Sequence, residues 1–310
     1  MQKNKFLKNQ STYIKGITLV FLGAVCFSTK AIFAKLAFKY GVDGITILMI
    51  RMLFSLPFYI VILFFENNKK SIRIPQKTWT TILILGIIGY YLAALFDFIG
   101  LQYVSANLER IVIFTYPTFV LLMGKLFFNR KILPIQFLAI LICYIGIILA
   151  FYSDKSIYNT ANLGKGCVFI LLSSLTYAFY LVNSDTVIKK IGTVRFTCIS
   201  MIISCMAVLI HFAVLHGFSI FNFPKQVYWL GICIAIISTV LPSFLMTNGI
   251  RLIGSSNMSI VASIGPIATI FMSYFILKEH ISLLHLLGTF FVLIGVLVIS
   301  FFGNKAKVMV

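Results

Sequence analysis

The sequence predicts an all-α membrane protein whose ten transmembrane helices form two inverted five-helix repeats. Of its 310 residues, 60% are hydrophobic and only 11% are charged, whereas a soluble domain has about 25% charged residues. The mean hydropathy is +1.04. Ten long apolar runs predict the ten helices, and an internal repeat predicts the two halves. Such a chain cannot cover its surface with groups that water solvates, so most of that surface must face lipid.

The apolar runs have the length that a bilayer requires. A crossing helix needs about 20 apolar residues, whereas a barrel strand has about 9–11 residues with alternating polarity. The runs are longer and do not alternate, which excludes strands. Ten crossings use the whole chain and leave no soluble domain. We expect helices over 14–38, 44–65, 78–98, 107–128, 134–152, 164–184, 195–216, 227–248, 256–277 and 282–302.

Lysine and arginine predict the orientation. The net charge of +19 lies mainly in short segments between apolar runs, so we interpret it as topogenic and expect no nucleic-acid partner. With the amino terminus in the cytoplasm, 17 basic residues lie on the cytoplasmic side and 6 on the other. Cytoplasmic segments of membrane proteins are enriched in basic residues. Both termini are therefore predicted to be cytoplasmic.

An internal repeat relates the two halves of the chain. The segment "GLQYVSANLERIVIFTYP" (100–117) corresponds to "GIRLIGSSNMSIVASIGP" (249–266), and Lys15-Gly16 corresponds to Lys165-Gly166, an offset of about 150 residues. The repeats are predicted over 14–152 and 164–302. Each half has five helices, and because this number is odd, the second half enters the membrane from the opposite side. Inverted halves are a common construction of secondary transporters, which place the substrate between them.

At these units the chain resembles the drug/metabolite transporter superfamily, specifically its ten-helix EamA-like members. The matching features are "SANLERIVIFTYPTFVLL" with Pro117 and "SSNMSIVASIGPIATIF" with Pro266, each followed by a short connector and a glycine-containing last helix. Family connectors usually carry a glutamate. The second connector keeps it as Glu279, whereas Arg130 replaces it in the first.

The resemblance implies a transporter of amino acids or similar small metabolites, often an exporter. We therefore expect a small-molecule substrate, a lipid bilayer around a monomer or weak homodimer, and a multi-pass protein of a bacterial inner membrane. Phosphorylated or nucleotide-linked anions are the alternative substrates, because the superfamily spans several solute classes. The resemblance fixes neither substrate, coupling ion nor direction.

Ionisable residues inside bilayer segments are costly and therefore candidates for function. Arg110 is our first candidate for substrate binding, because a guanidinium stays charged and offers a bidentate fork to a carboxylate or phosphate. An ion pair between Arg110 and Asp97 across the tight outer loop is the structural alternative. Lys30, well inside the first helix, is a second substrate candidate. Arg51, nearer the outer end of its helix, is expected to reach the headgroups.

Asp97 and Glu109 are candidates for proton coupling. Burial disfavours a charged carboxylate, so either could bind and release a proton during transport. The alternative for Glu109 is a role at the amino end of its helix, where it would favour the helix dipole. Asn107 is an equally good N-cap candidate.

Smaller polar and special residues complete the candidate site. Tyr177, Ser259 and Ser263 lie on polar stripes of the sixth and ninth helices, which either line a cavity or let helices pack closely. Pro117 and Pro266 occupy equivalent positions, where each removes one backbone hydrogen bond and can act as a hinge.

The sequence argues against the rival classes. It contains no Walker A motif, no HExxH and no GxSxG, so ATP hydrolysis and the common intramembrane enzyme chemistries are not expected. Its six cysteines lie in apolar runs and form no CxxC pair, so we expect neither metal site nor cofactor. A channel is the remaining alternative, distinguished by flux that does not saturate.

Overall fold

The fold is a bundle of helices. The structure is a computed structural model that describes residues 2–69, 74–129, 132–155, 160–217 and 223–308, and no strand occurs in these ranges. The first half contains α1 (Gln2–Phe38), α2 (Gly44–Lys69), α3 (Gln76–Leu85), η1 (Gly86–Leu92), α4 (Ala93–Leu101), α5 (Ala106–Ile113), α6 (Tyr116–Phe128) and α7 (Pro134–Lys155). The second contains α8 (Thr160–Ile191), α9 (Thr193–His216), α10 (Lys225–Ala235), η3 (Ile236–Val240), α11 (Leu241–Ala262), α12 (Ile264–Met272), η4 (Ser273–Leu277) and α13 (Leu283–Val308).

Most of these helices are suited to a membrane. Within the described residues, 8 helical segments are long and apolar enough to cross one, running from Thr12–Phe38 to Lys225–Ile253. Two shorter apolar helices, Ile264–Leu277 and Leu283–Ile299, fall where the ninth and tenth crossings are predicted. The chain is therefore a multi-pass membrane protein, and the number of ten crossings stays a prediction.

One predicted boundary is wrong. The sequence predicts a connector between helices over 227–248 and 256–277, but α11 continues to Ala262 and the interruption falls at Ser263. No proline lies between Pro242 and Pro266 to end the helix earlier, and proline is the residue that most strongly terminates a helix.

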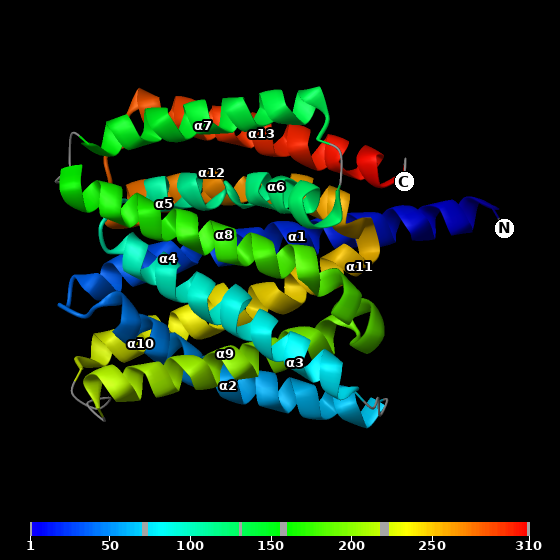
Figure 1. Cartoon of the computed structure of the whole chain (residues 1–310), viewed down its shortest axis with the longest axis horizontal. Helices are drawn as coiled ribbons and strands as arrows, with labels where there is room; N and C mark the ends of the chain where they lie inside the picture. The colour runs from blue at the N-terminus through cyan, green and yellow to red at the C-terminus, as the bar shows by residue number, and fades with distance from the viewer. Residues whose placement is uncertain (1, 70–73, 130–131, 156–159, 218–222, 309–310) are drawn as a thin grey trace.

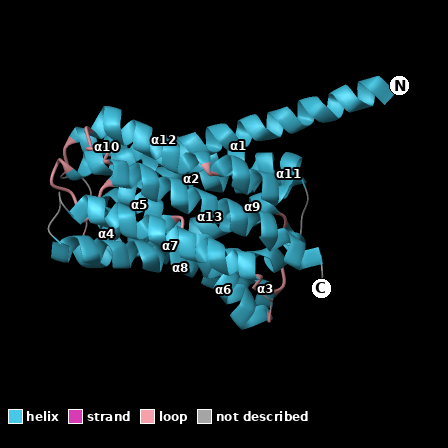
Figure 2. Ribbon diagram, turned by 90° about the horizontal axis from the view of Figure 1, so that it is seen from above, coloured by secondary structure: helices cyan, strands magenta, loops and turns pink. Residues whose placement is uncertain are grey.

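The helices form layers whose order is visible in Figure 1. Helices α7 and α13 pack together at one edge, α2 and α9 pack at the other, and α1 and α8 run between them. The start of α1 and the end of α13 lie at the same end of the bundle, where the start of α1 projects beyond it (Figures 1 and 2). The connector between α4 and α5 lies at the opposite end.

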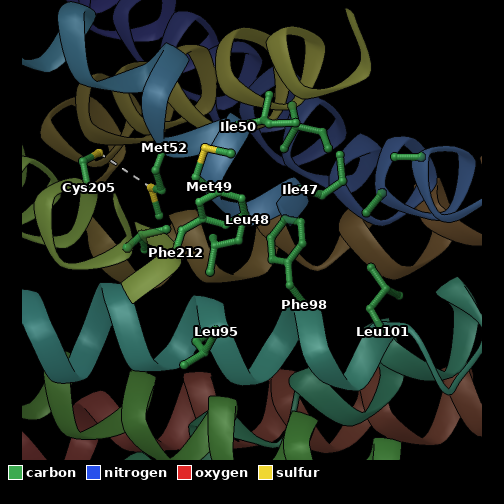
Figure 3. Close-up of a cluster of buried hydrophobic side chains, with 14 of the residues drawn as sticks. Ile47, Leu48, Met49, Ile50, Met52, Leu95, Phe98, Leu101, Cys205 and Phe212 are labelled. Carbon is green, nitrogen blue, oxygen red and sulfur yellow. Dashed lines mark hydrogen bonds between the residues drawn. The ribbon is translucent and has the colours of Figure 1, made fainter. Parts of the chain in front are cut away.

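A large apolar cluster fills the space among α2, α4 and α9. Ile47 and Met49 of α2, Phe98 of α4 and Cys205 of α9 are completely buried there, and Phe212 is nearly so (Figure 3). Helix α2 therefore has a fully enclosed segment, and this segment also carries Arg51.

Several helices are interrupted by irregular turns. The π-helical turns η1 and η3 lie inside the third and eighth crossing segments, and such turns often occur at functional sites. A break at Phe114–Thr115 separates α5 from α6, just before Pro117. Proline removes the hydrogen bond to the carbonyl four residues earlier, and that carbonyl, on Ile113, accepts instead from Ser174 Oγ at 3.1 Å. A neighbouring helix thus satisfies the group that the proline leaves free.

Candidate functional site

A buried ion network joins the three helices α1, α4 and α5. Lys30 of α1 donates from Nζ to Asp97 Oδ2 of α4, and at 3.1 Å to Glu109 Oε1 of α5. All three side chains are buried. The short connector after α4 places Asp97 and Glu109 side by side, and one lysine then neutralises part of the charge of both carboxylates.

Arg110 lies beside this network without joining it. The predicted alternative, an ion pair between Arg110 and Asp97, is wrong, because Asp97 pairs with Lys30. Arg110 instead donates from Nε to Thr269 Oγ1 of α12 at 3.1 Å and from Nη2 to the carbonyl of Phe27 at 3.3 Å. Its guanidinium lies 5.3 Å from the centre of the Phe27 ring. Arg110 therefore connects α5, α1 and α12.

Arg51 is also buried, in contrast to the headgroup position that its place in the sequence predicts. Its exposed fraction is 7%, because the first turns of α2 are themselves enclosed by the apolar cluster. The Nε group donates to Thr239 Oγ1 of η3 at 2.8 Å, and the guanidinium carbon lies 5.4 Å from the centre of the Phe98 ring. The position of Arg51 along its helix does not by itself indicate that neighbouring helices bury it.

Two carboxylate oxygens in the network have no partner within the described part of the chain. These are Asp97 Oδ1 and Glu109 Oε2. Buried polar atoms normally make at least one hydrogen bond. The two oxygens can therefore accept a hydrogen bond from a water molecule or an ammonium group, or bind a proton.

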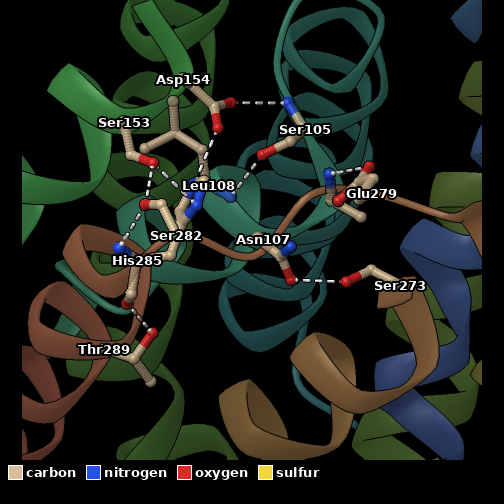
Figure 4. A network of polar contacts seen from close by, with 11 residues as sticks. Ser105, Asn107, Leu108, Ser153, Asp154, Ser273, Glu279, Ser282, His285 and Thr289 are labelled. Carbon is tan, nitrogen blue, oxygen red and sulfur yellow. Dashed lines mark hydrogen bonds and ion pairs between the residues drawn. The ribbon is translucent and has the colours of Figure 1, made fainter. Parts of the chain in front are cut away.

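A second polar network fixes the amino end of α5, the helix that carries Glu109 and Arg110 (Figure 4). The N-cap is Ser105, whose Oγ accepts from the Leu108 N–H at 3.0 Å. The predicted N-cap role of Asn107 is therefore wrong, whereas Glu109 does lie in the first turn of α5, where its charge favours the helix dipole. Asn107 Oδ1 accepts from Ser273 Oγ at 2.8 Å instead. Ser105 takes the N-cap position because it directly precedes the helix and its short side chain reaches the N–H groups of the first turn.

Two carboxylates from other elements hold the same helix end. Asp154 Oδ2 of α7 accepts from the Ser105 N–H at 3.1 Å, and its Oδ1 contacts His285 Nε2 of α13 at 2.8 Å. Glu279 Oε1 accepts from the Ala106 N–H at 3.0 Å. Negative groups are favourable at a helix amino end. Burial raises the pKa of the Glu279 carboxyl, and the hydrogen bond from Ala106 partly opposes this increase.

The remaining predicted site residues lie on other segments than α1, α4 and α5, the three helices of the charged network. The Tyr177 ring packs against Tyr116 at 5.4 Å and Tyr180 at 6.0 Å between centroids, in an aromatic group of its own. Ser263 occupies the break between α11 and α12, and the side chain of Ser259 lies outside the described residues. Pro117 and Pro266 each follow a helix break by three residues.

The network offers charges and hydrogen bonds rather than metal ligands. Within the described ranges, no group of three or more histidine, cysteine, aspartate or glutamate side chains could hold a metal ion. What the arrangement can do is bind a small charged solute: two arginines and a lysine can bind anionic groups, and two carboxylates can bind a cationic group or a proton.

Several relatives of this chain are named as transporters. The family model described as the EamA-like transporter family matches residues 14–152 and 164–301. The chain is 32% identical over 289 residues to the uncharacterized transporter YcbK of Bacillus subtilis, covering 90% of this chain and 92% of the relative. An uncharacterized transporter of Archaeoglobus fulgidus is 23% identical over 91% of this chain and 95% of its own length.

The fold is shared with a solved crystal structure. Its TM-score is 0.65 at 11% identity, over 94% of this chain and 98% of that chain. This likeness concerns the fold alone. The family match covers most of the chain, and its two matched segments include every residue of the buried ion network. The chain therefore belongs to the EamA-like transporter family.

Proposed function

We propose that the protein is a secondary transporter that exports a small polar metabolite, in the first place an amino acid, by alternating access of two inverted halves. The observation that carries this proposal is the buried network of Lys30, Asp97 and Glu109 with Arg110 beside it. Charges at this depth are retained where they bind substrates or ions. We further propose a monomer or weak homodimer in a bacterial inner membrane, with both termini cytoplasmic.

Local irregularities at constant spacing support two related halves over 14–152 and 164–302. The break at Phe114 and the break at Ser263 are 149 positions apart. So are the two non-glycine residues with left-handed backbone, Asn129 with φ 50° and Lys278 with φ 59°. Left-handed residues commonly end helices. Such matched irregularities are expected of two segments that share one fold.

Contacts between helices follow the same spacing. Gly100 of α4 lies against Gly166 and Ile170 of α8. Gly249 of α11 lies against Gly16 and Val20 of α1, which are the equivalent positions 149 or 150 residues away. The pairs α4–α8 and α1–α11 thus correspond under exchange of the halves. Rocking one half against the other would then give two related states, open to opposite sides.

The charges favour a zwitterionic substrate. Arg110 offers its remaining N–H donors to a carboxylate, and the unpartnered oxygens of Asp97 and Glu109 offer acceptors to an ammonium group. We propose that Lys30, Tyr177, Ser259 and Ser263 contribute to the same site in the course of the cycle. Asp97 and Glu109 are the proposed proton-coupling residues, and Pro117 and Pro266 the proposed hinges.

Counter-flow in liposomes tests the proposal. The purified protein is reconstituted and screened with labelled amino acids, with and without a pH gradient. Saturable exchange establishes a carrier, whereas non-saturating flux indicates a channel. Absence of exchange by folded protein over the whole panel overturns the amino-acid assignment in favour of phosphorylated or nucleotide-linked anions.

Two arginine variants sharpen this test. Arg110→Gln should abolish exchange while leaving the protein in the membrane. Arg195→Gln is the matched control, because Arg195 is equally buried but donates to Asn67 Oδ1 at 2.9 Å and to the Glu66 carbonyl at 3.2 Å. Exchange that survives in Arg110→Gln removes Arg110 from the site.

A further inference from the structure

Arg51 and Arg110 are built into the protein in the same way. Each donates from Nε to a threonine hydroxyl on the opposite half of the chain, Thr239 for Arg51 and Thr269 for Arg110. Each guanidinium also lies over a phenylalanine ring, Phe98 or Phe27 respectively. A guanidinium held by a ring and by at least one hydrogen bond is restricted in its orientation.

The threonines act as acceptors toward the arginines. Thr239 Oγ1 donates its hydrogen to the carbonyl of Ile234 at 2.9 Å, and Thr269 Oγ1 donates to the carbonyl of Gly265 at 3.1 Å. Each hydroxyl therefore turns a lone pair toward its arginine. A guanidinium has five N–H donors. In the described part of the chain, one of these is used at Arg51 and two at Arg110.

Neither arginine has a carboxylate partner among the described residues. Both carboxylates of the ion network contact Lys30. The buried cluster thus contains three permanently or normally cationic groups and two acidic ones. A buried charge without a counter-charge is costly. The surplus is balanced when a ligand brings acidic groups, and the two arginines provide two separate places for them.

Lys30 shares one aromatic neighbour with each arginine. Its Nζ is 5.6 Å from the centre of the Phe27 ring and 6.0 Å from that of Phe98, the same two rings that carry Arg110 and Arg51. Both arginines therefore border the Lys30 network, where the unpartnered oxygens of Asp97 and Glu109 lie. Two anion-binding forks and one cation-binding pair of oxygens are gathered in one place.

We propose that Arg51 is a second anion-binding residue of the transport site and that the substrate is an amino acid with an acidic side chain. This inference rests on the proposed transport function. One carboxylate would bind Arg110, the second would bind Arg51, and the ammonium group would bind the free oxygens of Asp97 and Glu109. The structural alternative, in which Arg51 only stabilises the bundle, predicts no dependence on the second acidic group.

Glutamate and glutamine form the matched probe pair, because they have the same shape and differ in the second acidic group. Labelled glutamate should exchange in proteoliposomes about tenfold more effectively than glutamine. Arg51→Gln should reduce this ratio about tenfold, which corresponds to about 1.4 kcal/mol, and Arg195→Gln should leave it unchanged. Equal exchange of both compounds by the native protein, or an unchanged ratio in Arg51→Gln, overturns the inference.

A binding measurement separates this inference from the proposed function. Thermal stabilisation of the detergent-solubilised full chain by glutamate over glutamine requires no transport. Such stabilisation without exchange refutes the transport proposal and supports the acidic site, whereas exchange of neutral amino acids without a preference for glutamate refutes the acidic site alone. If Arg51→Gln does not fold, Thr239→Val keeps the charge and removes the positioning hydroxyl, and it should lower the glutamate-to-glutamine ratio in the same direction.

Discussion

The contact between α7 and α13 offers a sharp test of the packing, because the same small-residue contact occurs twice. A methyl group added at Gly146 would lie 2.8 Å from Val292 Cγ2 and 3.0 Å from Val292 N. A methyl group added at Gly295 would lie 2.6 Å from the carbonyl oxygen of Ala139 and 3.2 Å from Cys143 N. Backbone atoms cannot give way as a flexible side chain can, so the helices must separate.

The expected cost follows from this crowding. Overpacking a well-packed interior destabilises by about 1–3 kcal/mol, and close approach through small residues is what holds membrane helices together. Gly146→Ala and Gly295→Ala should each lower the stability by an amount in this range. The two losses should be similar, because the two glycines make equivalent contacts on opposite helices. At Gly164 of α8 no atom lies within 4 Å of an added methyl group. Gly164→Ala should therefore be neutral or stabilising by up to about 1 kcal/mol, the helix preference for alanine.

Thermal unfolding of the purified variants in detergent measures these effects. The reasoning is refuted if Gly146→Ala unfolds at the same temperature as Gly164→Ala. A large loss of thermal stability in Gly146→Ala with none in Gly295→Ala would contradict the equivalence of the two contacts. It would still support close packing at Gly146. Tryptophan fluorescence is a suitable readout, because Trp79 and Trp229 lie outside the α7–α13 contact.

Three further predictions concern the networks and the orientation. Lys30→Met should destabilise the protein by about 3–5 kcal/mol, because it leaves two buried carboxylates unpaired; adding Asp97→Asn and Glu109→Gln should recover much of the thermal stability but no exchange. Glu279→Ala should cost about 1 kcal/mol, the usual value of a helix-end acceptor, whereas Glu279→Gln keeps an oxygen for Ala106 and should cost less in the same unfolding assay. A fluorescent protein fused to the carboxyl terminus should fluoresce and an alkaline phosphatase fused there should be inactive, and the reverse pair of results would contradict a cytoplasmic terminus.

The sequence predicted the helices well because their signal is local. Apolar runs of the right length are read directly from composition, and the 8 helices suited to a membrane coincide with predicted runs to within a few residues. The end of α11 was misplaced, because residues 249–255 were predicted to connect two helices. Within α11 these residues stay helical, and the strong breaker, Pro266, comes later.

Site residues were harder to predict, because their partners lie far away in the chain. Burial of Lys30, Asp97, Glu109 and Arg110 could be anticipated from their place in apolar runs. The partner of Asp97 could not be anticipated, because Lys30 is 67 residues away and Arg110 is much nearer in the sequence. Arg51 was misjudged for a related reason, because enclosure by neighbouring helices cannot be read from the sequence of one helix.

The hydrogen bonds at the amino end of α5 were missed altogether. Asp154 lies at the end of an apolar run, where a charged residue ordinarily faces water, and nothing local indicates that it is buried against His285. A signal did exist in the second connector, where Glu279 follows the family pattern. The family pattern identifies Glu279 but does not say what it does. In the structure, Glu279 accepts a hydrogen bond from the backbone N–H of Ala106 in α5.

The proposed repeat and the charged network have different symmetry, and this difference bears on mechanism. Under the offset of 149 or 150 residues, the positions equivalent to Lys30 and Arg110 are Tyr180 and Ser259, so the second half carries no copy of these charges. Its contribution is neutral, through Thr239 and Thr269. A scaffold that exchanges its halves can therefore alternate between two similar shapes while the ionic contacts to a substrate stay on the first half. The hydroxyl contacts that orient the two arginines cross between the halves, so movement of one half against the other acts directly on the groups that would hold the substrate.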